Sequence, residues 1–176
     1  GKPRRLTEHA AFYTDPVWTR DGRSVIALRA SRHERIMRES DWGNPAGTDL
    51  VRIPASGGAA RVIRPSRGLT LPHFGPEEGR IYLSSGAGLV SIAMDGRDRR
   101  NHFAAKGPGN YNTDENVAAE AIRLSPDGNT ALVQHADQLY AVRLLGTDKQ
   151  KIEIDITASA LPIARLTDIG ADDFGW

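Results

Sequence analysis

The sequence predicts an all-β fold of about three β-propeller blades, each a four-stranded antiparallel sheet, with flanking strands of neighbouring blades. The main reason is a pattern that occurs three times: a bulky apolar residue, a short turn with an acidic residue and glycine, and a strand-forming run. Its copies begin at Trp18, Phe74 and Leu124. Self-similarity at a spacing of tens of residues is typical of repeat architectures, in which each repeat is one supersecondary unit.

A second pattern follows each copy of the first. It is a four-residue run that begins with Leu and ends with Ile or Val, with a turn glycine four residues after its end. The three runs with their glycines are Leu50–Ile53 with Gly57, Leu89–Ile92 with Gly96, and Leu139–Val142 with Gly146. A third pattern, Arg-Leu-Thr, occurs at residues 5–7 and 165–167. Three repeats over that span have a mean period of roughly 53, close to the ~40–50 residues of four-stranded propeller blades.

The first and second strands of each blade are expected to meet at the acidic-glycine turn. Asp-Gly at 21–22 and at 127–128 is a hairpin signal, because Asp and Gly tolerate the positive φ of tight turns. The second copy has Glu77–Gly79, one residue further from its aromatic, so a longer loop is expected there. The runs at 24–28 and 130–133 are short, apolar and β-branched, as strands are.

The four-residue run is then the third strand of each blade, and the fourth strand follows the next glycine turn, as residues 60–63 do. A β-sandwich also has short strands and regular turns. It does not, however, predict the same turn dipeptide and the same spacing three times. We therefore predict a strand of a preceding blade at 1–7, blade one at 12–66, blade two at 69–105, blade three at 119–167, and the start of a following blade at 170–176.

Three blades with parts of their neighbours do not close a ring, because closed propellers have about 4–8 blades. We therefore expect the 176 residues to be a fragment of a longer protein. The alternative is a short chain that closes its ring by oligomerising.

The repeats resemble those of TolB-like, WD40-related β-propellers, whose signature is an aromatic residue, then Ser-Pro-Asp-Gly and a short apolar strand. Residues 124–128, Leu-Ser-Pro-Asp-Gly, match that signature apart from the aromatic, and residues 18–22 keep the Trp and the turn. More narrowly, four segments look like the propeller region that precedes the catalytic domain in large bacterial amidohydrolases. These segments are Pro72–Phe74, Arg80–Leu83, Gly88–Ser91 and Leu166–Gly170.

The resemblance implies a non-catalytic propeller module of a larger, metal-dependent amidohydrolase-type protein, serving substrate access or the binding of a domain or partner. The alternative is a stand-alone TolB-like scaffold for protein interactions. A periplasmic or extracytoplasmic location is implied by the same resemblance. The expected partner is a protein or another domain of the same parent chain, and self-association that closes the propeller is a further expectation.

Composition and charge argue against several function classes. The chain has no cysteine, and no run approaches the ~18 consecutive apolar residues of a membrane helix. Its net charge of +1 divides into 14 Lys and Arg against 9 Asp and Glu in residues 1–88, and 9 against 13 in residues 89–176. The basic residues are spread over strands and turns, whereas a nucleic-acid surface needs a continuous basic patch with aromatics. We therefore expect neither a nucleic-acid nor a membrane partner.

The sequence also lacks the motifs of a catalytic site. Its histidines form neither His-x-His nor His-Glu-x-x-His, the spacings that bind metals, and the Gly-x-Ser-x-Gly elbow of hydrolases does not occur. An insertion at 106–117 carries oxygen donors of the kind calcium uses, but without EF-hand spacing, so a solvated loop is expected. The chain is therefore predicted to hold no catalytic residue, cofactor or metal.

Two places are candidates for a binding surface. An insertion at residues 31–48 carries Arg35, Arg38 and Trp42, and a Trp with arginines is typical of binding hot spots. Alternatively, its apolar residues cover a groove between blades while its charges stay in solvent. His73 lies in an aromatic-bearing strand and either contacts a ligand in the central channel or is packed and hydrogen-bonded. The insertion is expected to protrude, because buried unpaired charge is unfavourable.

The repeat alignment also makes a direct structural prediction. Trp18, Phe74 and Leu124 should occupy equivalent positions in successive sheets, and all three side chains should be buried between blades.

Overall fold

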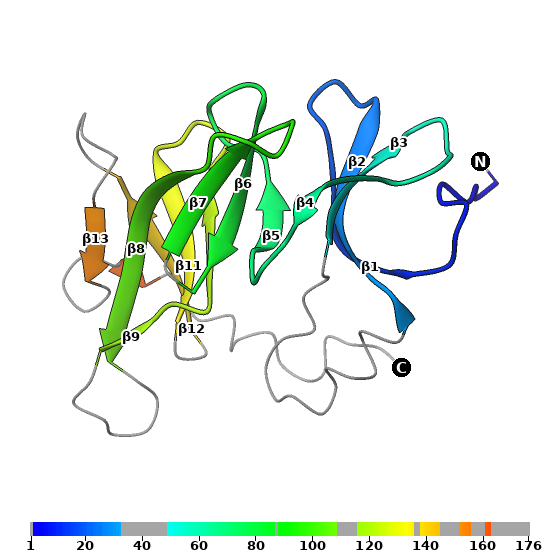
Figure 1. The fold of residues 1–176 in the computed structure, drawn as a ribbon. Coiled ribbons are helices and arrows are strands. Elements are labelled where there is room, and N and C mark those ends of the chain that lie inside the picture. Colours follow the sequence, from blue (N-terminus) through cyan, green and yellow to red (C-terminus); the bar gives the residue numbers. More distant parts are fainter. Residues whose placement is uncertain are drawn as a thin grey trace, which may run out of the picture.

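The described residues form three mainly antiparallel sheets, with the first sheet at the right of Figure 1 and the second at its centre. The computed structural model describes residues 2–32, 49–86, 88–108, 116–135, 138–144, 152–155 and 161–162. The first sheet has the strand order β1-β2-β3-β4. Its strands are β1 (Phe12–Trp18), β2 (Ser24–Ala30), β3 (Asp49–Pro54) and β4 (Arg61–Pro65).

The second and third sheets repeat this order along the chain. The second contains β5 (Thr70–His73), β6 (Arg80–Ser85), β7 (Gly88–Ala93) and β8 (Arg100–Pro108). Two further strands pair with β8, namely β9 (Asn116–Ala118) in antiparallel and β13 (Ile152–Asp155) in parallel orientation. The third contains β10 (Ala121–Leu124), β11 (Thr130–His135), β12 (Gln138–Arg143) and β14 (Leu161–Pro162). The prediction of an all-β fold with blade-like sheets is confirmed, although the second sheet has six strands instead of the predicted four.

The third sheet differs in detail from the predicted repeat. Residues of β13 fall within the range predicted for the third blade, yet they lie beside β8 of the second sheet. The fourth strand of the third sheet is instead the two-residue β14. The first strands remain close to one another, because β5 contacts both β1 and β10.

The acidic-glycine turn has the same internal hydrogen bonds in the first and third sheets. Thr19 Oγ1 donates to Asp21 Oδ1 at 2.6 Å, and Ser125 Oγ donates to Asp127 Oδ1 at 2.6 Å. In each turn the amide two residues after the Asp donates to the same carboxylate oxygen at 3.0 Å. These donors, the hydroxyl first, hold the pKa of both Asp carboxyls below the ordinary value. The repeated sequence therefore folds into a repeated turn.

A second repeated device is a bulge ahead of each aromatic position in the first two sheets. Asp15 and Leu71, the residues before Pro16 and Pro72, have left-handed φ angles of 51° and 52°. The strand register shifts at both places, between Thr14 and Val17 and between 70 and 73. Because a bulge adds a residue to one strand and bends it, these first strands acquire the same local bend.

The strand register gives every sheet two faces. On the second strands, Val25, Ile81 and Ala131 are at one equivalent position, and their chain neighbours point to the opposite face. Ile26 contributes to the cluster between the first and second sheets, and Tyr82 to the cluster between the second and third. We call the face that carries Ile26 or Tyr82 the following face, and the face that carries Val25, Ile81 or Ala131 the preceding face.

Two hydrophobic clusters join the sheets through these faces. The cluster between the first and second sheets contains Ile26, Leu28, Leu50, Leu69, Ile81, Leu83, Val90 and Ile92. The cluster between the second and third sheets contains Tyr82, Leu89, Phe103, Ala105, Ala119, Ile122, Ala131, Val133, Val142 and Leu144. Each cluster thus combines the following face of one sheet with the preceding face of the next. A smaller cluster of Val25, Ala27, Val51 and Ile53 covers the preceding face of the first sheet.

The aromatic positions are equivalent, as predicted, but one part of the prediction is wrong. Trp18 and Leu124 pair with the equivalent residues Val25 and Ala131. Phe74 and Leu124 are partly buried and pack against the clusters between sheets. Trp18 is 57% exposed, because it lies on the face of the first sheet that points away from the second. The insertion at 31–48 lies outside the described residues after position 32.

No helix within the described residues is long and apolar enough to cross a membrane.

The Gly128→Ala variant is expected to lose more stability than Gly22→Ala. Both glycines are left-handed, with φ of 73° and 65°, where an alanine costs about 1–2 kcal/mol. A Cβ on Gly22 meets nothing within 4 Å, whereas one on Gly128 lies 2.7 Å from Cγ of Pro76 in the β5–β6 loop. The difference between the two free energies of unfolding, measured in urea, therefore reports this contact. Equal losses at the two glycines would show that the contact is absent.

Candidate functional site

A network of hydrogen bonds and ion pairs around Arg80 and Arg100 borders a cleft between the second and third sheets. This cleft, which we call cleft 2–3, has a volume of about 450 Å³. Its apolar lining comes from Pro76, Phe103, Leu124 and Leu144, and its polar lining from Glu77, Tyr82, Arg100, Asn101 and His102. The β5–β6 loop, β8 and the first turn of the third sheet thus meet at one place.

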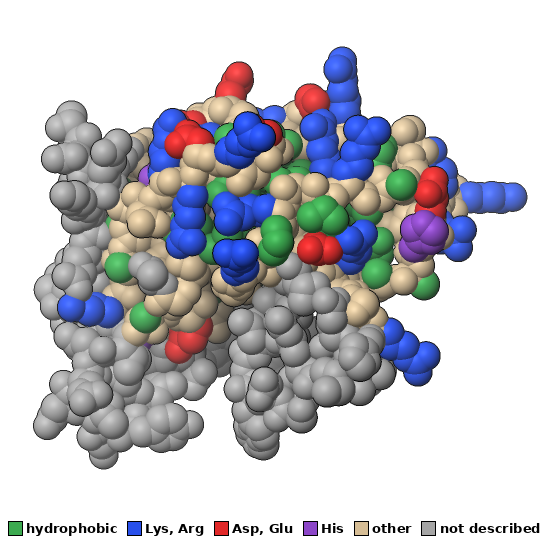
Figure 2. Space-filling view, in the orientation of Figure 1, with side chains coloured by type: hydrophobic (Ala, Val, Ile, Leu, Met, Phe, Trp, Pro, Cys, Tyr) green, Lys and Arg blue, Asp and Glu red, His purple; other side chains and the backbone are tan. Residues whose placement is uncertain are grey.

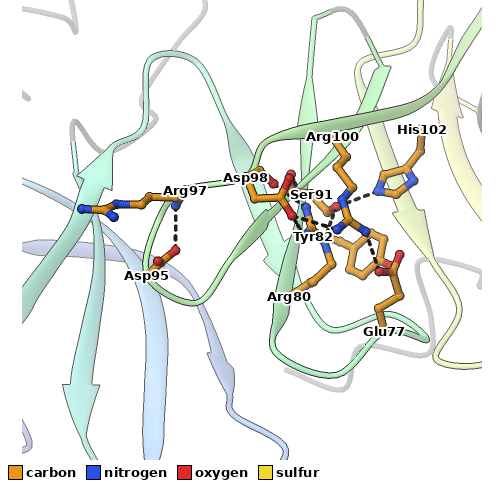
Figure 3. Close-up of polar contacts among 9 residues, drawn as sticks. All are labelled: Glu77, Arg80, Tyr82, Ser91, Asp95, Arg97, Asp98, Arg100 and His102. Atoms are coloured by element: carbon orange, nitrogen blue, oxygen red, sulfur yellow. Dashed lines mark hydrogen bonds and ion pairs between the residues drawn. The ribbon is translucent and has the colours of Figure 1, made fainter.

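Arg80 at the start of β6 is the buried cation beneath this network (Figure 3). The residue is only 5% exposed, yet each of its guanidinium nitrogens has a partner. Nε donates to Ser91 Oγ at 2.9 Å and Nη1 to Asp98 Oδ2 at 2.7 Å. Nη2 donates to the backbone carbonyls of Asp98 and Ser91. Because a buried charge is tolerated only when it is paired and hydrogen-bonded, Arg80 holds β6, β7 and the following turn together.

Arg100 extends the network from Asp98 to the β5–β6 loop. Its guanidinium donates to Asp98 Oδ2 at 2.8 Å and to Glu77 Oε2 at 2.9 Å. Hydrogen bonds from Arg80 and then Arg100 hold the pKa of the Asp98 carboxyl below its ordinary value. About half of the Arg100, Glu77 and Asp98 side chains is exposed, so these outer pairs stabilise the fold little. They orient the charged groups at the mouth of the cleft.

An aromatic ring lies between two histidines at the floor of this region. The Tyr82 ring is stacked on His102 at a centroid distance of 5.1 Å and is tilted toward His73 at 5.9 Å. Its hydroxyl donates to Glu77 Oε1 at 3.3 Å. Burial, followed by the Glu77 carboxylate, raises the pKa of Tyr82 to about 12. The phenol therefore remains protonated and serves as a hydrogen-bond donor.

His73 connects the second sheet to the third. Its Nδ1 lies 2.9 Å from the Leu71 carbonyl, and its Nε2 lies 2.9 Å from the Leu124 amide, which donates to it. This pattern requires the neutral imidazole with its proton on Nδ1. Ser84 Oγ accepts the Ile122 amide at 3.0 Å in the same way. Two amides of the edge strand β10 thus find acceptors on side chains of the neighbouring sheet.

A second cleft lies between the first and second sheets. This cleft 1–2 has a volume of about 510 Å³, with Phe74 and Met94 among its apolar lining residues and Arg20, Arg52 and Glu78 on its polar side. Arg52 Nε donates to the buried Ser24 Oγ at 2.8 Å, which orients the guanidinium. Arg20 reaches across the junction and donates to the Gly75 carbonyl. The two clefts therefore lie on opposite sides of the 74–79 loop.

The candidate residues from the sequence have different positions. His73 is 7% exposed and is engaged by Leu71 and Leu124, which corresponds to the packed, hydrogen-bonded alternative. Arg35, Arg38 and Trp42 lie outside the described residues. Sequence analysis did not single out the Arg80 and Arg100 network, since no short motif links arginines to acids at such spacings. The signal that could have pointed to this network is Arg80 itself, an arginine at the start of a strand directly after the acidic residues of the 77–79 loop.

The chemistry of these residues favours binding by hydrogen bonds and apolar contact. In the described part of the chain, no group of three or more His, Cys, Asp or Glu side chains is placed to hold a metal ion. The basic side chains on the face seen in Figure 2 are interspersed with acidic and hydrophobic ones. No protein-family model matches the sequence, and no characterised protein matches it either.

The free energy of unfolding is expected to decrease as the pH is lowered below about 6.5, because of His73 and His102. Burial lowers the pKa of both histidines from 6.5 in the folded chain, and for His73 the charge of Arg123 acts in the same direction. As the pH falls, the histidines are therefore protonated in the unfolded chain before they are protonated in the folded chain. The free energy of unfolding decreases from about pH 6.5 down to the pKa values of the folded chain. Urea midpoints between pH 7.5 and 5 measure this loss.

The His73→Gln variant removes one of the two contributions to that pH dependence. Its midpoint should change less between pH 7.5 and 5 than that of the original chain. An unchanged dependence would mean that His73 is protonated equally easily in the folded and unfolded states.

Proposed function

We propose that this chain is a non-catalytic module of propeller-type blades that binds a protein segment on the face carrying the first turns of the sheets. The observation that carries the proposal is the pair of clefts on either side of the 74–79 loop. A partner that straddles this loop places one group in each cleft. Each cleft combines apolar side chains with arginine, and arginine and aromatic residues are enriched at protein interfaces.

The paired charges of the network in cleft 2–3 favour a binding surface that is formed before a partner arrives over a site with free reactive groups. Arg80 is saturated by Ser91 and Asp98, and Arg100 is held by two carboxylates, so the charged groups are already paired. Pre-oriented side chains lose little entropy when a partner binds. Asn101 lines the same cleft and is exposed, so its amide is accessible to the backbone of a bound segment.

The nature of the partner follows from the sequence resemblance alone. Similarity to the propeller region of bacterial amidohydrolases supports another domain of the same parent protein as the occupant, in an extracytoplasmic setting. A stand-alone interaction scaffold of the TolB type would use the same clefts for a separate protein. Both versions assign the chain a binding role and place the chemistry elsewhere.

Selection of displayed random peptides against the immobilised chain tests the binding role. A family of related peptides should be enriched, and the affinity of its consensus for Asn101→Trp should be at least about tenfold weaker, because the indole fills cleft 2–3. The matched control is Arg99→Trp, which adds the same ring at an exposed position outside the lining of either cleft. Failure to enrich any family, or equal binding by both variants, would contradict the proposed site.

A further inference from the structure

The third sheet exposes apolar side chains at positions whose equivalents are buried at both internal junctions. On the second strands, Ile26, Tyr82 and Leu132 are equivalent in register. Ile26 is fully buried and Tyr82 is 1% exposed, because the next sheet covers each of them, whereas Leu132 is 42% exposed. At Leu132, the following face of the third sheet therefore carries an apolar side chain that no sheet among the described residues covers.

The third strands repeat this observation independently. Leu50, Leu89 and Leu139 are equivalent, because they pair with Leu28, Ser84 and Gln134 on the second strands. Leu50 is fully buried and Leu89 is 1% exposed, but Leu139 is 37% exposed. Leu132 on β11 and Leu139 on β12 thus form one exposed apolar patch on adjacent strands, which we call the tail patch.

At the opposite end of the stack, the centre of the preceding face of the first sheet is buried, and two apolar side chains beside this buried centre are exposed. Phe74 and Leu124 pack against the sheet that precedes them, while the equivalent Trp18 is 57% exposed. Val62 on β4, paired with the buried Val51 of the same face, is 50% exposed. These two side chains flank the small cluster of the first sheet and form a head patch.

We propose that the tail patch of one copy of this chain docks on the head patch of a second copy. The tail patch lies on the kind of face that is buried at both internal junctions, and Trp18 of the head patch is equivalent to Phe74 and Leu124, which pack at those junctions. Residues 1–88 carry an excess of basic and residues 89–176 an excess of acidic side chains, which favours head-to-tail over head-to-head contact. This contact is separate from the clefts of the proposed function.

A head-to-tail contact is heterologous, so copies add in one direction and form a ring or a filament. Exposed apolar patches at the edges of soluble proteins commonly mark such contacts. The contact predicts that the average mass of the full chain in solution rises with concentration. Analytical ultracentrifugation over a hundredfold range of concentration measures this directly.

Two variants distinguish head-to-tail contact from the symmetric alternatives. Trp18→Glu disables the head patch and Leu132→Glu disables the tail patch, and each is expected to stay monomeric at all concentrations. An equimolar mixture of the two still contains one intact head and one intact tail, and it should form a dimer and nothing larger. Val62→Glu and Leu139→Glu repeat the experiment at second positions, and Ala118→Glu, an exposed site on β9, is the control that should associate normally.

Each other outcome overturns the proposal. If the chain remains monomeric over the whole concentration range, the two patches do not bind each other and the proposed contact does not form. Association that survives either single variant shows a symmetric contact through the other patch. A mixture that stays monomeric, with thermal melts showing both variants folded, shows that the two patches do not meet.

Discussion

The first and second sheets each have two apolar faces to bury, and the stacked arrangement follows from that constraint. Neighbouring residues of a strand point to opposite sides, so Ile26 and Ala27 both need an apolar cover. The first sheet satisfies one side by packing on the second, which packs in turn on the third. Full burial of a Leu or Ile side chain stabilises a fold by about 1.5–3 kcal/mol. The junctions are therefore the main source of stability, and the turns determine only which strands meet.

The junction between the second and third sheets also supplies hydrogen-bond acceptors for backbone amides of β10. Among the described strands, β10 is the edge of the third sheet and presents amides with no strand beside them. A buried unpaired amide costs about 1–3 kcal/mol. Ser84 and His73 accept two of these amides. Because His73 must stay neutral to do so, and its ring lies against Tyr82 at the floor of cleft 2–3, the same side chain links stability, pH and the shape of the candidate site.

The turns and the fold class were accessible from sequence because their determinants are local. Asp21 and Asp127 are each followed by glycine, so the same turn was expected twice, and a hydroxyl residue two positions earlier, Thr19 or Ser125, caps each one. The exposure of Trp18 was not accessible, because burial depends on which sheet lies opposite and no local pattern encodes that. Likewise, the pairing of Arg80 with Asp98 depends on the β7–β8 turn bringing residues 18 positions apart into contact.

Amide hydrogen exchange of β10 tests the central claim that successive sheets are joined through these faces and acceptors. The account predicts that the amides of Ile122 and Leu124 exchange as slowly as those of the central strand β11, although β10 is an edge strand. It also predicts that Ser84→Ala accelerates exchange at Ile122 more than at Leu124. Exchange of both amides at the rate of an unstructured peptide, or no selective effect of the substitution, would contradict the junction described above.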